Sequence, residues 1–172
     1  GLTAGAVLYV RVWAKSGLSG DFELCVVDQC PSGPPNNDQP CNAQALVLGT
    51  TYTGYNSCSD GTGEPYPPSG AGAAPVCWAN SGGTVDLNTV WYTFTAPASG
   101  AVRIRTTLGS LTNTQIALYQ GAFCFSLIPV AGTTCNDDYL QCGNSTFASE
   151  LIATGLTAGA TYYVVLDGRN SL

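Results

Sequence analysis

The sequence contains no histidine and no methionine, and only 9% of its 172 residues are charged. Without histidine, a Ser-His-Asp or Cys-His catalytic machine cannot be assembled. Five basic residues against eleven acidic ones argue against nucleic acid and anionic membranes, since both require clustered Lys and Arg. No apolar run approaches the roughly 20 residues that span a bilayer. We therefore expect a non-catalytic protein with no membrane span and no nucleic-acid partner.

The chain is rich in cysteine, and the eight residues stand at wide, unequal spacings. They are Cys25, Cys30, Cys41, Cys58, Cys77, Cys124, Cys135 and Cys142. Zinc sites usually show paired C-x₂₋₄-C units, often with histidine, and the chain has no histidine. The even number of cysteines therefore predicts disulfides and a secreted, extracellular location. Local closures, Cys25–Cys30 and Cys135–Cys142, are the simplest pairings. A bond from Cys41 to Cys58 or Cys77 would hold a long loop, and the spacing leaves the connectivity open.

The string GLTAGA occurs twice, at Gly1–Ala6 and at Gly155–Ala160, each time before a strand-like segment. Only the first copy continues into a second such segment, within Ser19–Asp28. This repeat predicts that residues 1–30 are terminal strands equivalent to the end of a preceding module. Residues 31–40, PSGPPNNDQP, then read as a Pro-rich linker, and residues 41–172 as a module without its final strand.

Apolar and polar residues alternate in short segments, and no helical period is present. The predicted strands are Val7–Ala14, Asp21–Val27, Thr89–Thr95, Ala101–Thr106, Asn113–Tyr119, Phe147–Ala153 and Thr161–Leu166, with weaker signals at Gln44–Thr53 and Val76–Ala79. Turns rich in Gly, Pro and Asn separate them. This pattern indicates an all-β sandwich or barrel. Trp91 lies opposite the apolar face of its strand, so a loop or a neighbouring module has to cover it.

The run VWYTFTAPASGAVRI, followed by NTQIALYQG, CNDD and LTAGATYYVVLDG, resembles a known family. It is similar to the bacterial pre-peptidase C-terminal (PPC-like) domain and to cysteine-containing repeats of large secreted surface proteins of Bacteroidetes-type bacteria. The resemblance covers about Asn88 to Gly168. Residues 20–27, GDFELCVV, match the family's final strand, displaced to the front, and Asp38–Leu46 resembles the module opening. The departures are this displacement and Asn113, where the family often has Asp.

This resemblance implies a jelly-roll-like β-sandwich, here stapled by disulfides and with its last strand moved to the N-terminus. Such modules are non-catalytic repeats or accessories of secreted proteases, adhesins and surface proteins. Some relatives bind calcium or polymeric ligands such as collagen or polysaccharide.

Calcium is the one cofactor that the residues suggest. Carboxylate, amide and carbonyl oxygens are its preferred ligands, and Asn136, Asp137 and Asp138 could supply them together with Asn113. The alternative reading is that Asn and Asp stand there because they form turns. No spacing in the chain matches a defined calcium loop.

Two functions remain open. In the first, the chain is a structural module of a fibre or repetitive surface protein, and its partners are neighbouring copies or modules. Strand exchange would then place Phe22, Leu24 and Val26 beside an edge formed by Tyr162, Val164 and Leu166. Residues 1–30 could also fold back onto their own module. In the second, the chain is a binding module for polysaccharide or host protein, and the loop carrying Tyr66 and Trp78 is its ligand surface.

Overall fold

The computed structural model describes residues 5–28, 30–65, 88–132, 135–141 and 144–168. These residues form an all-β protein whose helical content is two 3₁₀ turns, η1 (Lys15–Gly17) and η2 (Pro40–Asn42). The strands are β1 (Gln44–Ala45), β2 (Val90–Thr95), β3 (Val102–Arg105), β4 (Thr114–Gln120), β5 (Ile128–Pro129), β6 (Cys135–Asn136), β7 (Tyr139–Gln141), β8 (Asn144–Thr146), β9 (Glu150–Ala153) and β10 (Thr161–Gly168).

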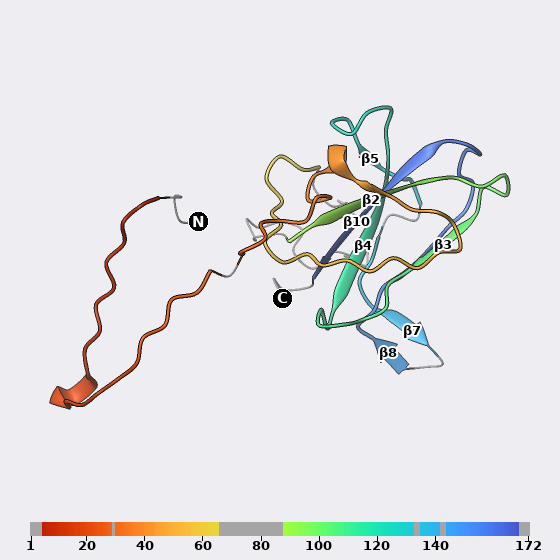
Figure 1. The fold of residues 1–172 in the computed structure, drawn as a ribbon. Helices are drawn as coiled ribbons and strands as arrows, with labels where there is room; N and C mark the ends of the chain where they lie inside the picture. Colours follow the sequence, from red (N-terminus) through yellow and green to blue (C-terminus); the bar gives the residue numbers. More distant parts are fainter. Residues whose placement is uncertain (1–4, 29, 66–87, 133–134, 142–143, 169–172) are drawn as a thin grey trace.

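The largest sheet has the order β1-β2-β10-β4-β5, and β6 also pairs with β4. Strand β10 occupies the centre, because it is antiparallel to β2 on one side and to β4 on the other. Val164, for example, lies opposite Tyr92 of β2 and Leu118 of β4. The only parallel pairing described is that of β1 with β2. Figure 1 shows β2, β10 and β4 running through the middle of the body.

Both faces of this sheet are covered, which follows from its continuous apolar strands. On one face, Phe94, Leu118 and Val164 pack against the second sheet, formed by β3 and β9. Leu151 and Ala153 of β9 complete that core. The two sheets therefore face each other across one apolar layer.

The other face holds a smaller cluster around Trp91, which has no exposed surface, with Tyr119 and Val165 beside it. The rings of Trp91 and Tyr119 lie 5.4 Å apart. The expectation that Trp91 is covered is confirmed.

The repeated GLTAGA string forms the turn between β9 and β10 in its second copy. Leu156 is buried there, and its N–H donates to the Gly100 carbonyl at 2.9 Å. Gly100 has a φ of 62°, and a Cβ at this position would lie 2.6 Å from the Leu156 oxygen. The APASG turn thus requires glycine where it meets the GLTAGA turn.

Five of the predicted strands form, and they are β2, β3, β4, β9 and β10. The signal at Gln44–Thr53 shrinks to the two residues of β1, and Val76–Ala79 lies outside the described residues. The segments Val7–Ala14 and Asp21–Val27 contain no strand. A strand is stable only when a neighbour satisfies its backbone, and no described residue pairs with either segment.

The stretch expected to be a linker, residues 31–40, packs on the body instead. Asn37 is buried, and its Nδ2 donates to the Trp91 carbonyl at 2.9 Å while its own carbonyl accepts from Trp91 N–H at 2.8 Å. Pro35 and Pro40 are buried as well. These prolines shape a covering segment rather than a spacer between modules.

Candidate functional site

The most unusual feature of the molecule is the N-terminal arm, residues 5–28, which extends away from the body (Figure 1). Every residue of the arm is exposed. Its large apolar side chains are Val7, Leu8, Tyr9, Val10, Val12, Trp13, Leu18, Phe22, Leu24, Val26 and Val27, each at least 49% exposed. Soluble proteins rarely leave so many neighbouring apolar side chains in water unless a partner covers them.

The arm reverses direction at η1. Ser16 and Gly17 both have positive φ, 62° and 71°, which is the backbone conformation of a type I′ hairpin turn. A tight turn of this kind matches the twist of two antiparallel strands. Before it, the Arg11 guanidinium lies 5.7 Å from the Trp13 ring centre. The arm therefore has the turn of a hairpin while its two limbs are unpaired.

The base of the arm is fixed to the body by a disulfide between Cys30 and Cys58. A second disulfide joins Cys41 to Cys124, and Cys135 is also disulfide-bonded. Cys25 is a free, exposed thiol on the arm. The expected pairing of Cys25 with Cys30 is therefore wrong, because Cys30 bonds to Cys58. The expected bond from Cys41 to Cys58 or Cys77 is wrong as well, because Cys41 bonds to Cys124. Cys77 and Cys142 lie outside the described residues.

The predicted acceptor for strand exchange, the edge with Tyr162, Val164 and Leu166, is also wrong. These residues belong to β10, and both sides of β10 are already paired. Tyr162 and Val164 are buried in the core, and Leu166 packs against it. An additional strand cannot form a ladder with β10. Phe22, Leu24 and Val26, the predicted donor residues, are exposed on the arm.

An open strand edge is present elsewhere, at β3. Among the described residues, β3 pairs with β9 and with no other strand. Val102 and Ile104 point toward the core and are partly buried, whereas Arg103 and Arg105 are exposed. A sequence reading missed this edge because the alternation in β3 is that of any half-buried strand.

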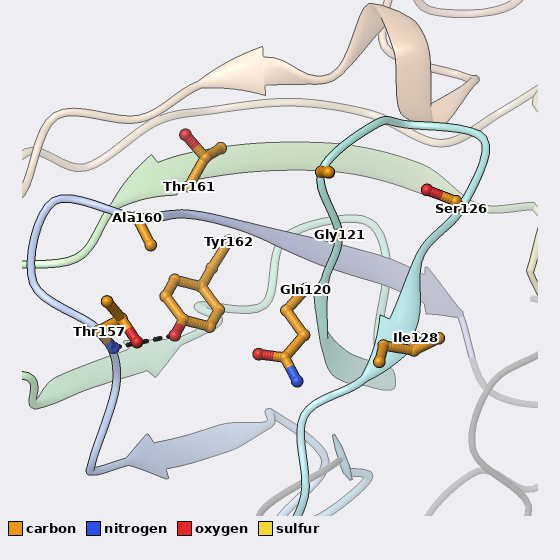
Figure 2. A pocket seen from close by; sticks show the side chains of 9 residues that line it. Gln120, Gly121, Ser126, Ile128, Thr157, Ala160, Thr161 and Tyr162 are labelled. Atoms are coloured by element: carbon orange, nitrogen blue, oxygen red, sulfur yellow. Dashed lines mark hydrogen bonds between the residues drawn. The ribbon is translucent and has the colours of Figure 1, made fainter.

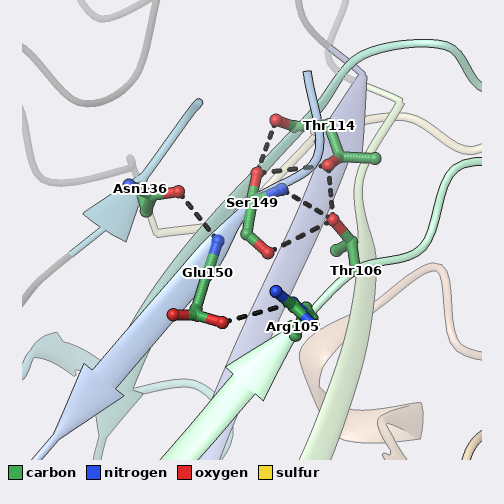
Figure 3. A network of polar contacts seen from close by, with 6 residues as sticks. All are labelled: Arg105, Thr106, Thr114, Asn136, Ser149 and Glu150. Carbon is green, nitrogen blue, oxygen red and sulfur yellow. Dashed lines mark hydrogen bonds and ion pairs between the residues drawn. The ribbon is translucent and has the colours of Figure 1, made fainter. Parts of the chain in front are cut away.

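Among the predicted calcium residues, Asn136 has a structural role at the junction of the two sheets (Figure 3). Asn136 Oδ1 accepts from the Glu150 N–H at 2.9 Å, and Asn136 Nδ2 donates to the Asp138 carbonyl at 3.1 Å. Ser149 Oγ lies 2.7 Å from the Asp137 carbonyl and 2.6 Å from that of Thr114. The side-chain groups of Asn136 are thus occupied within the protein.

Asn113 precedes β4 beside this junction, and its Oδ1 is buried without a hydrogen-bond partner. Within the described ranges, no group of three or more His, Cys, Asp or Glu side chains is arranged to hold a metal ion. The predicted calcium site of Asn113, Asn136, Asp137 and Asp138 stays a prediction.

Two carboxyl groups are buried near the start of β2 and the end of β10. Burial raises the pKa of Glu64 to about 7, against a hydrogen bond from Thr89 Oγ1 at 2.6 Å that lowers it. Burial likewise raises the pKa of Asp167 to about 6, although the N–H of Gly168 and the side chain of Gln115 donate to it. Both groups therefore keep a proton to a higher pH than an exposed carboxyl group does, and their effect is on stability.

An open hollow of about 490 Å³ lies between the β4–β5 loop and the start of β10 (Figure 2). The hollow is lined by Gln120, Ile128, Thr157 and Tyr162. The phenol oxygen of Tyr162 accepts a hydrogen bond from the Thr157 N–H at 3.0 Å. In the same loop the exposed rings of Phe123 and Phe125 stack 5.3 Å apart. The predicted ligand residues Tyr66 and Trp78 lie outside the described residues.

The comparison with known proteins found no matching family model, no matching curated protein and no matching solved structure. What the structure defines is a class: a disulfide-bonded all-β protein with an exposed apolar arm. Its disulfides indicate an oxidising environment. In the part of the chain that the structure describes, no helix has the length and apolar character for crossing a bilayer.

Proposed function

We propose that the chain is a non-catalytic structural module of an extracellular bacterial fibre or repetitive surface protein. Copies or consecutive modules join head to tail when the arm of one supplies a strand to the next. The observation that carries this proposal is the arm, whose residues 5–28 are all exposed despite eleven large apolar side chains. An exposed segment that can form a strand completes its backbone hydrogen bonds and buries its apolar side chains when it pairs with the open edge of a sheet.

The fold that we propose for the module is a PPC-like, jelly-roll-like sandwich. The two facing sheets and their short antiparallel strands support it, as does the resemblance of residues 88–168 to that family. We further propose that the protein is secreted, since disulfides persist outside the cytoplasm. Tandem modules of one polypeptide and separate subunits would both present the same local contact.

The repeat supports the same proposal. Gly5 in the first GLTAGA copy and Gly159 in the second have nearly the same positive φ, 77° and 78°. Leu8, Val10 and Val12 follow the first copy at the spacing at which Tyr162, Val164 and Leu166 follow the second. The arm therefore carries the sequence of a module's last hairpin.

The test is to measure the mass of the purified, oxidised chain over a range of concentrations by light scattering, with electron microscopy of the concentrated sample. We expect oligomers or filaments from the full chain and monomers from a variant lacking residues 1–28. The triple substitution Phe22→Ser, Leu24→Ser and Val26→Ser should also give monomers. Leu18→Ser, an exposed apolar position at the arm's tip, is the matched control. A full chain that stays monomeric at all concentrations contradicts the proposal.

The second candidate, a carbohydrate- or protein-binding adhesin or accessory module of a secreted enzyme, draws support from the hollow beside Gln120 and the stacked pair of Phe123 and Phe125. Exposed rings provide flat apolar surface for a sugar face or an apolar side chain. Binding of soluble polysaccharide by the monomeric variant, lost on substituting both phenylalanines by serine, would favour it.

A further inference from the structure

We infer that the acceptor for the arm is the open edge of β3, and that its occupant is the segment Asp21–Val27 of a second copy. This inference rests on the proposed function and names the partner surface that the function requires. Both sides of β10 are already paired, so β10 cannot accept a further strand. Among the described residues, the edge of β3 that faces away from β9 is open and lies beside the core.

The edge of β3 that faces away from β9 carries backbone groups to which a further strand could hydrogen-bond. The Thr106 N–H donates to the Ser149 carbonyl at 2.9 Å, so this pair is hydrogen-bonded, and alternate pairs toward Val102 follow the same pattern. The N–H and C=O groups of the intervening residues, Arg103 and Arg105, therefore point away from β9. They form the row of donors and acceptors that an added strand would satisfy.

The two segments also match in their side chains. On β3, Val102 and Ile104 face the core and are only partly buried. In Asp21–Val27 the residues Phe22, Leu24 and Val26 lie on one face of a strand, and the opposite face begins with the charged residues Asp21 and Glu23. Docked beside β3, the apolar face would extend the core and cover the exposed flank of Val102 and Ile104.

The outer faces are complementary in charge. Arg103 and Arg105 supply two of the five basic residues of the chain, and the outward positions of the arm segment are Asp21 and Glu23. Opposite charges at neighbouring cross-strand positions stabilise a sheet, and like charges destabilise it. Arg105 already contacts Glu150 of β9 at 3.2 Å on one side, and the arm would supply a carboxylate on the other.

The outer edge of β9 is a poorer acceptor for the same segment. The outward N–H of Glu150 is already occupied by Asn136 Oδ1 at 2.9 Å. Glu150 itself would stand beside Asp21 or Glu23, which places like charges together. Both the hydrogen bonds and the charges favour β3.

The position of the two surfaces favours a second copy over the chain's own arm. In Figure 1 the arm leaves the body on the side away from β3, and Cys30–Cys58 fixes its base there. A donor on one side and an acceptor on the other give a heterologous contact, which repeats into an open filament.

Charge reversal tests the assignment in the full-length chain. Arg103→Glu should weaken association about tenfold, because it removes one opposite-charge cross-strand contact and creates a like-charge contact in its place. Adding Glu23→Arg to it should restore association to within about threefold of the natural chain in an antiparallel ladder that joins Glu23 to Arg103, and adding Asp21→Arg should do so in a parallel ladder that joins Asp21 to Arg103, since coupled pairs are non-additive. Lys15→Glu, with the same change of net charge at the arm's tip, is the control. Equal association of Arg103→Glu and Lys15→Glu overturns the role of β3.

Cross-linking through the native thiol of Cys25 gives an independent reading. If Glu23 pairs with Arg103 in an antiparallel ladder, Cys25 lies beside Ala101, and in a parallel ladder that joins Asp21 to Arg103 it lies beside Thr107. We expect Ala101→Cys or Thr107→Cys to form disulfide-linked oligomers under mild oxidation. Thr51→Cys, exposed on the body, should not.

The outcomes separate this inference from the proposed function. Assembly that depends on the arm but gives no cross-link at Ala101→Cys or Thr107→Cys overturns the β3 acceptor and leaves the proposed function standing. A disulfide formed within one monomer shows that the arm occupies its own β3 and overturns the head-to-tail partner. A chain that never associates contradicts the proposed function itself.

Discussion

At the scale of the residue, Asn136 shows how a side chain that looks like a metal ligand can be fully used by the fold. It connects β6 to β9 through the Glu150 N–H and to the following turn through the Asp138 carbonyl. Around it, Thr106, Thr114 and Ser149 form a connected network of hydroxyl groups (Figure 3). Buried networks of this kind are costly to interrupt, because each lost partner leaves a polar group without water.

We therefore predict that Asn136→Ala lowers the free energy of unfolding by about 1–3 kcal/mol, the cost of buried groups left without partners. Urea unfolding measures the change, and Ser99→Ala at an exposed turn is the control. The loss should be the same in EDTA and in millimolar calcium. A loss that appears only with calcium present would make Asn136 a ligand instead.

The raised pKa of Glu64 predicts that the free energy of unfolding depends on pH near neutrality. Burial raises its pKa from 4.5 to about 7, so the folded state keeps a proton that the unfolded chain releases near pH 4.5. Between these values the folded state binds more protons, and the free energy of unfolding falls as the pH rises toward 7. The protein should be more stable at pH 5 than at pH 8.

The variant Glu64→Gln isolates this contribution, because an amide keeps the hydrogen bond from Thr89 and does not titrate. We expect the natural chain to lose about 1–2 kcal/mol between pH 5.5 and 8, allowing for the partial exposure of Glu64. The variant should be nearly flat from pH 6.5 upward and keep the dependence below pH 6 that Asp167 supplies. Equal slopes in both proteins above pH 6.5 would assign the effect to another group.

At the scale of the element, the disulfide between Cys41 and Cys124 joins η2 to the loop between β4 and β5. It closes a loop of 83 residues, and in the chain-entropy model a loop of this length stabilises a protein by about 4 kcal/mol. We predict that the double variant Cys41→Ser and Cys124→Ser loses about that much, measured by urea unfolding of the chain lacking residues 1–28. A loss below about 1 kcal/mol would show that packing alone holds this loop.

The strands with one or two apolar faces were predictable because burial imposes the alternation that the sequence displays. That is why β2, β3, β4, β9 and β10 appear where expected. The two-residue strands β5 and β6 carry too little pattern to be recognised, and β1 forms only the first two residues of the weak signal at Gln44–Thr53. The neighbours of β10 depend on pairing across tens of residues, and no local pattern records which strands meet.

The site could be predicted in part for the same reasons. The repeated GLTAGA string and the apolar residues that follow it are the sequence signals from which we propose that the arm is an assembly element. The alternation in Val7–Ala14 and Asp21–Val27 predicts strands, and these require a partner that the sequence does not specify. The only sequence signal for the acceptor is the opposition of Asp21 and Glu23 to Arg103 and Arg105, which becomes readable once β3 is known to be an open edge.

At the scale of the whole molecule, the arm lies outside the core of the body. The exposure of residues 5–28 means that the body does not use them for its own core. The covering segment 31–40 and the disulfide at Cys30 belong to the body. Removal of the arm should therefore leave the fold intact, and occupation of β3 should stabilise it.

Thermal unfolding at several protein concentrations tests this separation. A chain that binds its neighbour only when folded is stabilised by mass action, by about 2.7 kcal/mol when the free concentration is 100 times Kd. We predict that the Tm of the full chain rises with concentration, and that the chain lacking residues 1–28 has a constant Tm equal to the dilute limit of the full chain. A lower Tm for the truncated protein at every concentration would mean that the arm stabilises its own body. A constant Tm for both proteins would mean that association does not stabilise the folded state. Covering the half-exposed side chains of Val102 and Ile104 with a partner strand would then contribute no measurable free energy.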